Sequence, residues 1–408
     1  MKTALLTAAI SVFCSPLLTS QAQASGLPAD LPPAKCQKDF QSFEQWKQDF
    51  RKEALASGIS VQTFELASPQ ITYSAAIIAK DQSQGGFYKA FLDFALPRAN
   101  PRISPARAQF AKHAAVFNKI KNQTGMAPEI LVAFWGMETD FRMGRSAKQS
   151  PVITSMATLA YDCRRAAAFR MNLLASLHLL EKREVAIENM VGEWAGEMSG
   201  LQFTPSNFWE FGVDFDGDGK RDPVNSVADM MGTAANMFIQ NGWRRGEPYM
   251  VEVKVPANMA WEEADMTVTK VRPMSFWQQQ GVTSVTGGAL PNANMQGALM
   301  LPMGRLGPAF IAYPNFRALL KWNASSNNAL TAAYLASRIV SSSTPAMSPG
   351  RGKVEVMISP EIKQIQTLLA AKGYNIGKID GFIGTGTREA VRTEQLKLGL
   401  PADAYASL

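Results

Sequence analysis

Glu138 is the residue whose surroundings most directly indicate chemistry. It lies in residues 128–141, an apolar segment with a proline in its first turn, and this pattern predicts a helix. The apolar residues expected on the same helical face are Leu131, Phe134, Trp135 and Phe141. A carboxyl on an apolar stripe is costly to ionise, so it tends to keep its proton and can act as a general acid. The helix alone also allows a buried structural glutamate bonded to an arginine or to backbone.

A Gly/Ala-rich bend at residues 193–205 follows this helix in the chain. Gly and Ala let a polymeric ligand approach the backbone closely. Gln202 in the bend can donate and accept hydrogen bonds at once, which suits sugar hydroxyls and acetamido groups. The bend therefore predicts a surface where a polysaccharide could lie.

The elements that must position these residues are mainly helical. Helical periodicity of apolar residues recurs, beginning with Phe43, Trp46, Phe50 and Ala54, and Gly58 is expected to end that first helix. Further helices are predicted over residues 104–123, 164–182 and 228–241, and short strands over 251–255 and 266–271. We expect one domain over residues 25–340, a Ser/Pro/Gly linker over 341–356 and a small helical module over 357–408.

Residues 214–229 have the pattern of a calcium loop. The carboxylates that could bind the ion come from Asp214, Asp216 and Asp218. Lys220 stands at the position that supplies a main-chain carbonyl. Position 12 is Asn225 and not glutamate, but Asp229 could close a longer loop. The pattern leaves two interpretations open, a structural Ca²⁺ and a hydrated acidic turn. We expect no cofactor for catalysis.

The N-terminus indicates export. Residues 1–24 combine Lys2, an apolar run and the small residues Ala22 and Ala24 around Gln23, which is the pattern of a cleavable signal peptide. The 408-residue chain is 46% hydrophobic and 18% charged, enough for two or three folded domains. No later segment is long and apolar enough to be a transmembrane helix.

The charge indicates which kind of polymer the protein could bind, and the cysteines and histidines indicate which disulfide or metal sites are possible. The net charge of +7 is not arranged in Lys/Arg blocks with interleaved aromatics, so nucleic acid is not expected, and an anionic cell-wall polymer suits an exported basic protein better. Without the signal, Cys36 and Cys163 remain, and they are candidates for a disulfide or for two free thiols. His113 and His178 lack a second ligand at metal spacing, so zinc is not expected.

Five ordered segments resemble the B family of soluble-type lytic murein transglycosylases. They are residues 134–141 (Phe-Trp-Gly-Met-Glu-Thr-Asp-Phe), 194–206, 214–219, 301–310 and 313–323. The tail separately resembles the three-helix peptidoglycan-binding module, although Glu394 stands where that module has a Phe. The resemblance implies a mainly α fold, a lysozyme-like α+β catalytic domain with helical extensions, followed by a small three-helix module.

The same resemblance implies an activity and a set of site residues. Members of the family cleave the MurNAc–GlcNAc bond of peptidoglycan without water and leave 1,6-anhydromuramyl ends. Glu138 falls on their single acid/base, with the substrate's acetamido group assisting. The implied substrate-binding residues are Gln202, Asn323, Phe94, Trp322 and Glu193, of which Phe94 stands where Tyr is common and Glu193 where Ser is usual. The implied setting is the periplasm, with glycan strands and other murein enzymes as partners.

The residues leave two further functions open. A hydrolysing muramidase would need a second carboxylate to activate water, and Glu193 or Glu197 could supply it. A non-catalytic scaffold would bind peptidoglycan without cleaving it. Anhydro ends, reducing ends or no products from digested murein would separate the three.

Overall fold

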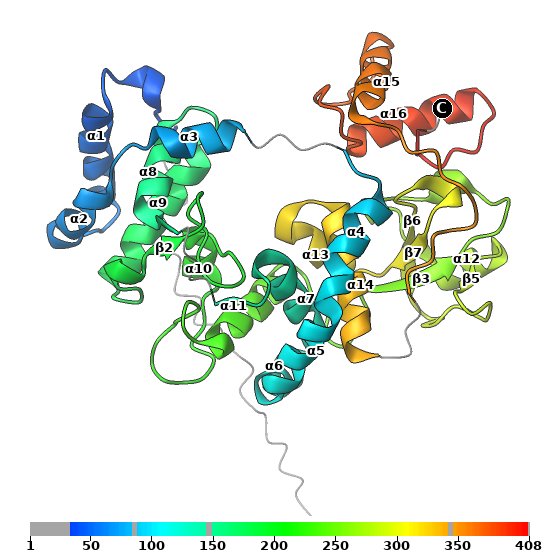
Figure 1. The fold of residues 1–408 in the computed structure, drawn as a ribbon, viewed down its shortest axis with the longest axis horizontal. Coiled ribbons are helices and arrows are strands. Elements are labelled where there is room, and N and C mark those ends of the chain that lie inside the picture. The colour runs from blue at the N-terminus through cyan, green and yellow to red at the C-terminus, as the bar shows by residue number, and fades with distance from the viewer. Residues whose placement is uncertain (1–32, 84–87, 144–148, 342–345, 407–408) are drawn as a thin grey trace, which may run out of the picture.

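The computed structural model describes residues 33–83, 88–143, 149–341 and 346–406. The predicted signal, residues 1–24, lies outside these ranges. The described residues are mainly helical, with a small antiparallel sheet on one side (Figure 1). None of the helices within them is long and apolar enough to cross a membrane.

One helical group contains the first three helices and the pair α8 and α9, on the left of Figure 1. Their bounds are α1 Phe43–Ala56, α2 Val61–Ala67, α3 Ala75–Gln82, α8 Val152–Tyr161 and α9 Ala166–Glu181. The predicted apolar stripe of α1 is confirmed, because Trp46, Phe50 and Ala54 are buried and the first two rings stack at 5.5 Å. Gly58 follows the end of α1 with a φ of +95°, a conformation that favours glycine.

The second helical group is built around α7. Its members are α4 Phe91–Ala99, α5 Ile103–Lys112, α6 Ala114–Thr124, α7 Pro128–Thr139, α11 Val227–Gln240, α13 Phe316–Asn323 and α14 Ser326–Val340. Helix α10 Pro205–Phe211 lies between the two groups and packs on α9 and α11. Helix α14 packs against α4, α5 and α7. The single helix predicted over 104–123 is wrong, because the chain turns at His113 between α5 and α6, where the imidazole packs 6.0 Å from the Trp135 ring.

A five-stranded antiparallel sheet has the order β4-β6-β7-β3-β5. Its strands, and the helix beside them, are β3 Met250–Lys254, β4 Arg272–Pro273, α12 Met274–Gln279, β5 Thr283–Ser284, β6 Gln296–Met300 and β7 Ala309–Ala312. A separate pair joins β1 Ser150–Pro151 to β2 Val191–Gly192. The predicted strand 266–271 is instead a turn, since the Asp265 carboxylate accepts hydrogen bonds from the main-chain N–H groups of Thr267, Thr269 and Lys270.

The C-terminal module contains α15 Ser359–Ala371 and α16 Thr385–Lys397. Within the described residues it has the two helices that the residues predict, and the third helix that the resemblance implies is absent. The chain after α16 runs as a buried loop, in which Asp403 and Tyr405 lie against Gly304 and Arg305. Glu394 accepts hydrogen bonds from Tyr374 at 2.5 Å, from Lys397 at 3.0 Å and from Lys372, which explains how a carboxylate is tolerated there.

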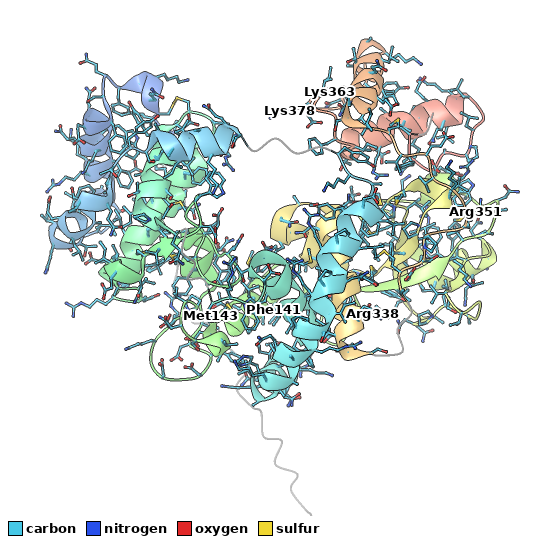
Figure 2. The ribbon with its side chains drawn as sticks, viewed as in Figure 1. Phe141, Met143, Arg338, Arg351, Lys363 and Lys378 are labelled. Carbon is cyan, nitrogen blue, oxygen red and sulfur yellow. A yellow bond between two sulfur atoms is a disulfide. The ribbon has the colours of Figure 1, made fainter. Side chains whose placement is uncertain are left out.

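The module is docked on the sheet side of the molecule (Figure 1). Arg388 donates to the main-chain oxygen of Pro302 at 3.0 Å, and Arg392 donates to that of Ala264 at 2.5 Å. Part of the predicted linker is also held, because the N–H and the guanidinium of Arg351 bond Leu306 and Arg305 (labelled Arg351 in Figure 2). The sequence predicts a loose tether, and the described part of it is fixed by these bonds.

Candidate active site

Glu138 lies in the last turn of α7 and is partly exposed. The residues before it are buried around the whole helix, as the burial of Leu131, Val132, Ala133 and Phe134 on successive positions makes plain. The predicted apolar stripe is therefore wrong as a description of α7, which lies in the middle of its helical group and has no solvated face. Glu138 is instead the carboxyl at the partly open end of a buried helix.

Two side chains hold Glu138 in place. The indole N–H of Trp322 donates to its Oε1 at 3.1 Å, and the amide of Gln202 donates to its main-chain oxygen at 3.2 Å. Burial raises the pKa of Glu138 above its ordinary value, the Trp322 bond opposes this rise, and the negative charge of Glu197 adds to it. The net direction favours the protonated form, which a general acid needs.

The end of α7 is fixed by its own hydrogen bonds. Asp140, in the left-handed region with a φ of +52°, ends the helix and pairs with Arg102 at 2.7 Å. The indole of Trp135 donates to the main-chain oxygen of Arg142 at 2.7 Å. Phe141, labelled in Figure 2, has its ring edge-on to Trp135 at 5.7 Å. The backbone that carries Glu138 is thereby rigid.

A hairpin-like bend, residues 191–203, lies against this helix end. Met198 and Phe203 exchange two main-chain hydrogen bonds of 2.8 Å, and the Thr139 hydroxyl donates to the main-chain oxygen of Gly200 at 2.7 Å. A Cβ on Gly200 would lie 2.2 Å from the Arg142 oxygen, so only glycine fits. The sequence predicts close approach by a ligand at this bend, whereas at Gly200 the close approach is by Arg142, just after α7, and by the Trp135 indole.

Within the same bend, Glu193 and Glu197 face each other across a tight turn. The N–H of Glu193 donates to the main-chain oxygen of Glu197 at 2.8 Å. Burial raises the pKa of Glu197, and the charge of Glu193 adds to that rise while Arg165 opposes it. The sequence suggests Glu197 only as the second carboxylate of a muramidase. The signal for it is a second glutamate four positions after Glu193 in the same bend.

The other predicted substrate-binding residues are spread around this centre. Trp322 packs among the rings of Phe134, Phe203 and Phe238. Asn323 is exposed, and its side-chain oxygen accepts from the N–H of Ser325 at 3.2 Å. The Phe94 ring on α4 is covered by the Arg98 guanidinium at 3.9 Å. Among the residues described, no hydrogen bond joins Asn323 or Phe94 to Glu138.

Residues 42–337 match the family described as transglycosylase SLT domain. The chain belongs to this family. Residues 359–407 match the peptidoglycan binding domain family. Both matched ranges fall within the predicted domains 25–340 and 357–408.

The chain is similar to several known proteins. Membrane-bound lytic murein transglycosylase B of Escherichia coli strain K12 is 28% identical over 212 residues, which are 50% of this chain and 55% of that protein. The chain thus spans about half the length of that curated relative.

Solved structures extend the likeness. SltB3 from Pseudomonas aeruginosa, solved with NAG-anhNAM-pentapeptide and with NAG-NAM-pentapeptide, is 37% identical with a TM-score of 0.81, over 90% of this chain and 98% of that one. SLT35 from Escherichia coli, solved with calcium, shares the fold at 23% identity and a TM-score of 0.60, over 72% of this chain and 92% of that one. The lysozyme-like fold predicted from sequence is confirmed.

The acidic loop of this chain gathers Asp214, Asp216 and Asp229, each with one carboxylate oxygen within 4.8 Å of the others. Ca²⁺ binds oxygen at 2.3–2.6 Å, so two of its ligand oxygens lie at most about 5 Å apart, and this group fits one ion. The predicted ligand Asp218 is outside the group, and its carboxylate accepts from the N–H of Lys220 at 2.8 Å. Asp229 is fully buried and accepts three main-chain hydrogen bonds, so it orders the loop.

Cys36 and Cys163 are joined by a disulfide with Cα atoms 5.1 Å apart. It ties the segment before α1 to the turn between α8 and α9. In that turn, Arg164 and Arg165 both pair with the buried Asp81, at 2.7 and 2.6 Å. The disulfide and these ion pairs hold the N-terminal segment and α3 to the turn between α8 and α9.

Proposed function

We propose that this protein is a periplasmic lytic transglycosylase that cleaves the MurNAc–GlcNAc β-1,4 bond of peptidoglycan, with Glu138 as its single acid/base. The observation that carries the proposal is the partly buried carboxyl of Glu138, with its pKa raised by burial and its Oε1 bonded by Trp322. The peptidoglycan fragments bound to SltB3 support the substrate class.

The proposed reaction has two proton transfers at one carboxyl. Glu138 gives its proton to the glycosidic oxygen as the bond from that oxygen to C1 of MurNAc breaks. The acetamido group of the substrate stabilises the electron-poor C1. The ionised Glu138 then takes the proton of the C6 hydroxyl while O6 attacks C1, which forms the 1,6-anhydro ring and returns the carboxyl to its starting state. Water is not consumed, and no second carboxylate is needed.

A hydrolysing muramidase is the second candidate, because Glu197 lies close enough to Glu138 to influence its ionisation. In that reaction a carboxylate would activate water at C1. The curated relative, a lytic murein transglycosylase, and the NAG-anhNAM-pentapeptide bound to SltB3 favour the transglycosylase.

The test is Glu138→Gln, which keeps the shape and removes the transferable proton. Release of anhydromuropeptides from sacculi should fall at least about 100-fold, as expected when a general acid is lost. Glu129→Gln is the matched control, since Glu129 is a partly buried carboxyl in the first turn of the same helix and should be dispensable. Near-normal turnover by folded Glu138→Gln would refute the assignment, and reducing ends from the unmodified protein would favour the muramidase.

We further propose a structural Ca²⁺ held by Asp214, Asp216 and Asp229, with no part in the chemistry. The fit of these oxygens supports it, as does the calcium in SLT35, which shares the fold. An ion that binds only the folded state raises the melting temperature with its concentration. The melting temperature should therefore rise between chelator and millimolar calcium, and less so in Asp214→Asn. A melting temperature that does not change with calcium would favour the interpretation of this loop as a hydrated acidic turn.

The remaining proposals concern the cellular location of the protein and its partners. Residues 1–24 would direct export to the periplasm, where glycan strands are the partner and other murein enzymes could assemble with the protein. Residues 357–408 would bind peptidoglycan, as the matched family of that module indicates.

A further inference from the structure

Trp322 makes a specific contact with the acid/base. Its indole N–H donates to Oε1 of Glu138 at 3.1 Å from a position 184 residues later in the chain. An indole nitrogen can only donate. The Oε1 that it contacts must therefore act as an acceptor, which leaves Oε2 as the carboxyl oxygen that carries the proton.

The indole ring is fixed by its neighbours. It stacks on Phe238 of α11 with ring centroids 5.3 Å apart and planes 13° apart, and it packs on Phe134 of α7 at 4.9 Å. Phe203 from the bend adds a third ring at 6.1 Å. Three rings from separate elements thus set the direction of the N–H before any substrate arrives.

Helix α13, which carries Trp322, is itself anchored at its start. The buried Asn315 accepts from the N–H of Arg244 at 2.6 Å and donates to the main-chain oxygen of Glu247 at 2.7 Å. Arg317 donates to the main-chain oxygen of Val268 at 2.8 Å. The Trp322 indole is therefore carried by a fixed helix, and its N–H keeps one direction.

We propose that Trp322 is a positioning residue, whose N–H holds Oε1 of Glu138 so that Oε2 delivers the proton to the glycosidic oxygen and later receives one from the C6 hydroxyl. This inference rests on the proposed function. Once the first proton has left Oε2, Glu138 is anionic, and a hydrogen bond to an anion is stronger than one to the neutral acid. The Trp322 hydrogen bond therefore stabilises the developing carboxylate of Glu138 more than it stabilises the neutral acid, and this difference lowers the barrier.

The charged groups that face Glu138 limit what else could shift its titration. The bend contributes Glu197, whose charge acts on Glu138, while Asp140 at the end of α7 is paired with Arg102. Helices α11 and α13 contribute the uncharged rings of Phe238 and Trp322. Replacing Trp322 by Phe leaves these charges in place and removes one bond that favours the ionised form, so the pKa of Glu138 should rise further above its ordinary value.

The experiment is Trp322→Phe, which keeps an aromatic ring and loses the donor. On soluble glycan strands, kcat should fall roughly tenfold with KM within about twofold, since the difference between a charged and a neutral acceptor is of this order. The basic limb of the kcat–pH profile should move to higher pH. The matched control is Trp277→Phe, whose buried indole bonds Gly297 far from the site and whose loss should leave the pH profile unchanged.

A second measurement needs no change at Trp322. The indole proton of Trp322 in the unmodified protein should shift with pH at the midpoint of the activity limb, and the shift should vanish in Glu138→Gln. Wild-type kcat in Trp322→Phe, a loss confined to KM, or an indole resonance indifferent to pH would overturn the inference. If Glu138→Gln stayed active the proposed function would fail, whereas an inactive Glu138→Gln beside a fully active Trp322→Phe would overturn only the role of Trp322.

Discussion

Glu197 influences the acid/base through its charge alone, because no hydrogen bond joins the two side chains within the described residues. Burial is the main cause that raises the pKa of Glu138, and the Glu197 carboxylate adds to it. Two carboxyls in one site disfavour each other's ionisation. The charge at position 197 should therefore set how far up the pH scale Glu138 stays protonated.

Glu197→Gln should move the activity profile to lower pH. Removing the negative charge lowers the pKa of Glu138, so the acid form is lost at a lower pH and the basic limb of kcat/KM shifts down. Glu193→Gln should not move the limb down, because the charge of Glu193 acts on Glu197 and is not among the causes that raise the pKa of Glu138. An unmoved limb in Glu197→Gln, measured on soluble glycan strands, would contradict this.

Single residues differ in how well the sequence predicts them. Glu138 could be named because its segment carries several recognisable neighbours in order. Its surroundings could not be derived, since the donor Trp322 lies 184 residues away and the apolar neighbours of Glu138 cover every side of α7. Helical periodicity reports which residues are apolar, and a helix buried on all sides has no face for it to reveal.

At the level of elements, the junction of α7 with the bend at 191–203 depends on the lack of a side chain at Gly200. Gly200→Ala would place Cβ 2.2 Å from the Arg142 oxygen and 2.6 Å from the Trp135 indole nitrogen. We expect a loss of about 1–3 kcal/mol in unfolding free energy, as overpacking produces, together with reduced activity because Gln202 is displaced. Gly288→Ala, with Ser284 at 3.6 Å as its nearest neighbour, is the matched control. Equal denaturant midpoints for the two variants would count against this account.

Elements with strong local boundaries were predicted well. Helix α11 begins at Val227 after Ser226, which caps it by accepting from the N–H of Asp229. The elements that failed depend on remote or non-periodic contacts. The helical periodicity of residues 104–123 continues through His113, but the helix is interrupted there, where the imidazole packs on Trp135. Residues 266–271 alternate like a strand, but their main chain folds around the Asp265 carboxylate.

For the whole molecule, the sequence predicts two modules joined loosely, and the structure packs them together. Composition detects the Ser/Pro/Gly segment but not the bonds that form across it. Arg388 and Arg392 are largely buried, and both donate to main-chain oxygens of the catalytic domain. A module held in this way keeps a fixed distance from Glu138 and does not move independently of the catalytic domain.

The double variant Arg388→Met/Arg392→Met should release the module. Each substitution keeps an apolar stem and leaves a buried carbonyl, that of Pro302 or Ala264, without its donor, at about 1–3 kcal/mol each. We expect a lower melting temperature and faster tryptic cleavage at Lys353, the basic residue beside the docked segment. Lys378→Met, which removes an exposed cation of the same module (labelled Lys378 in Figure 2), should change neither. If the double variant melted and was cleaved like the unmodified protein, the docking bonds would contribute nothing in solution, and the loose tether predicted from the linker composition would be the better description.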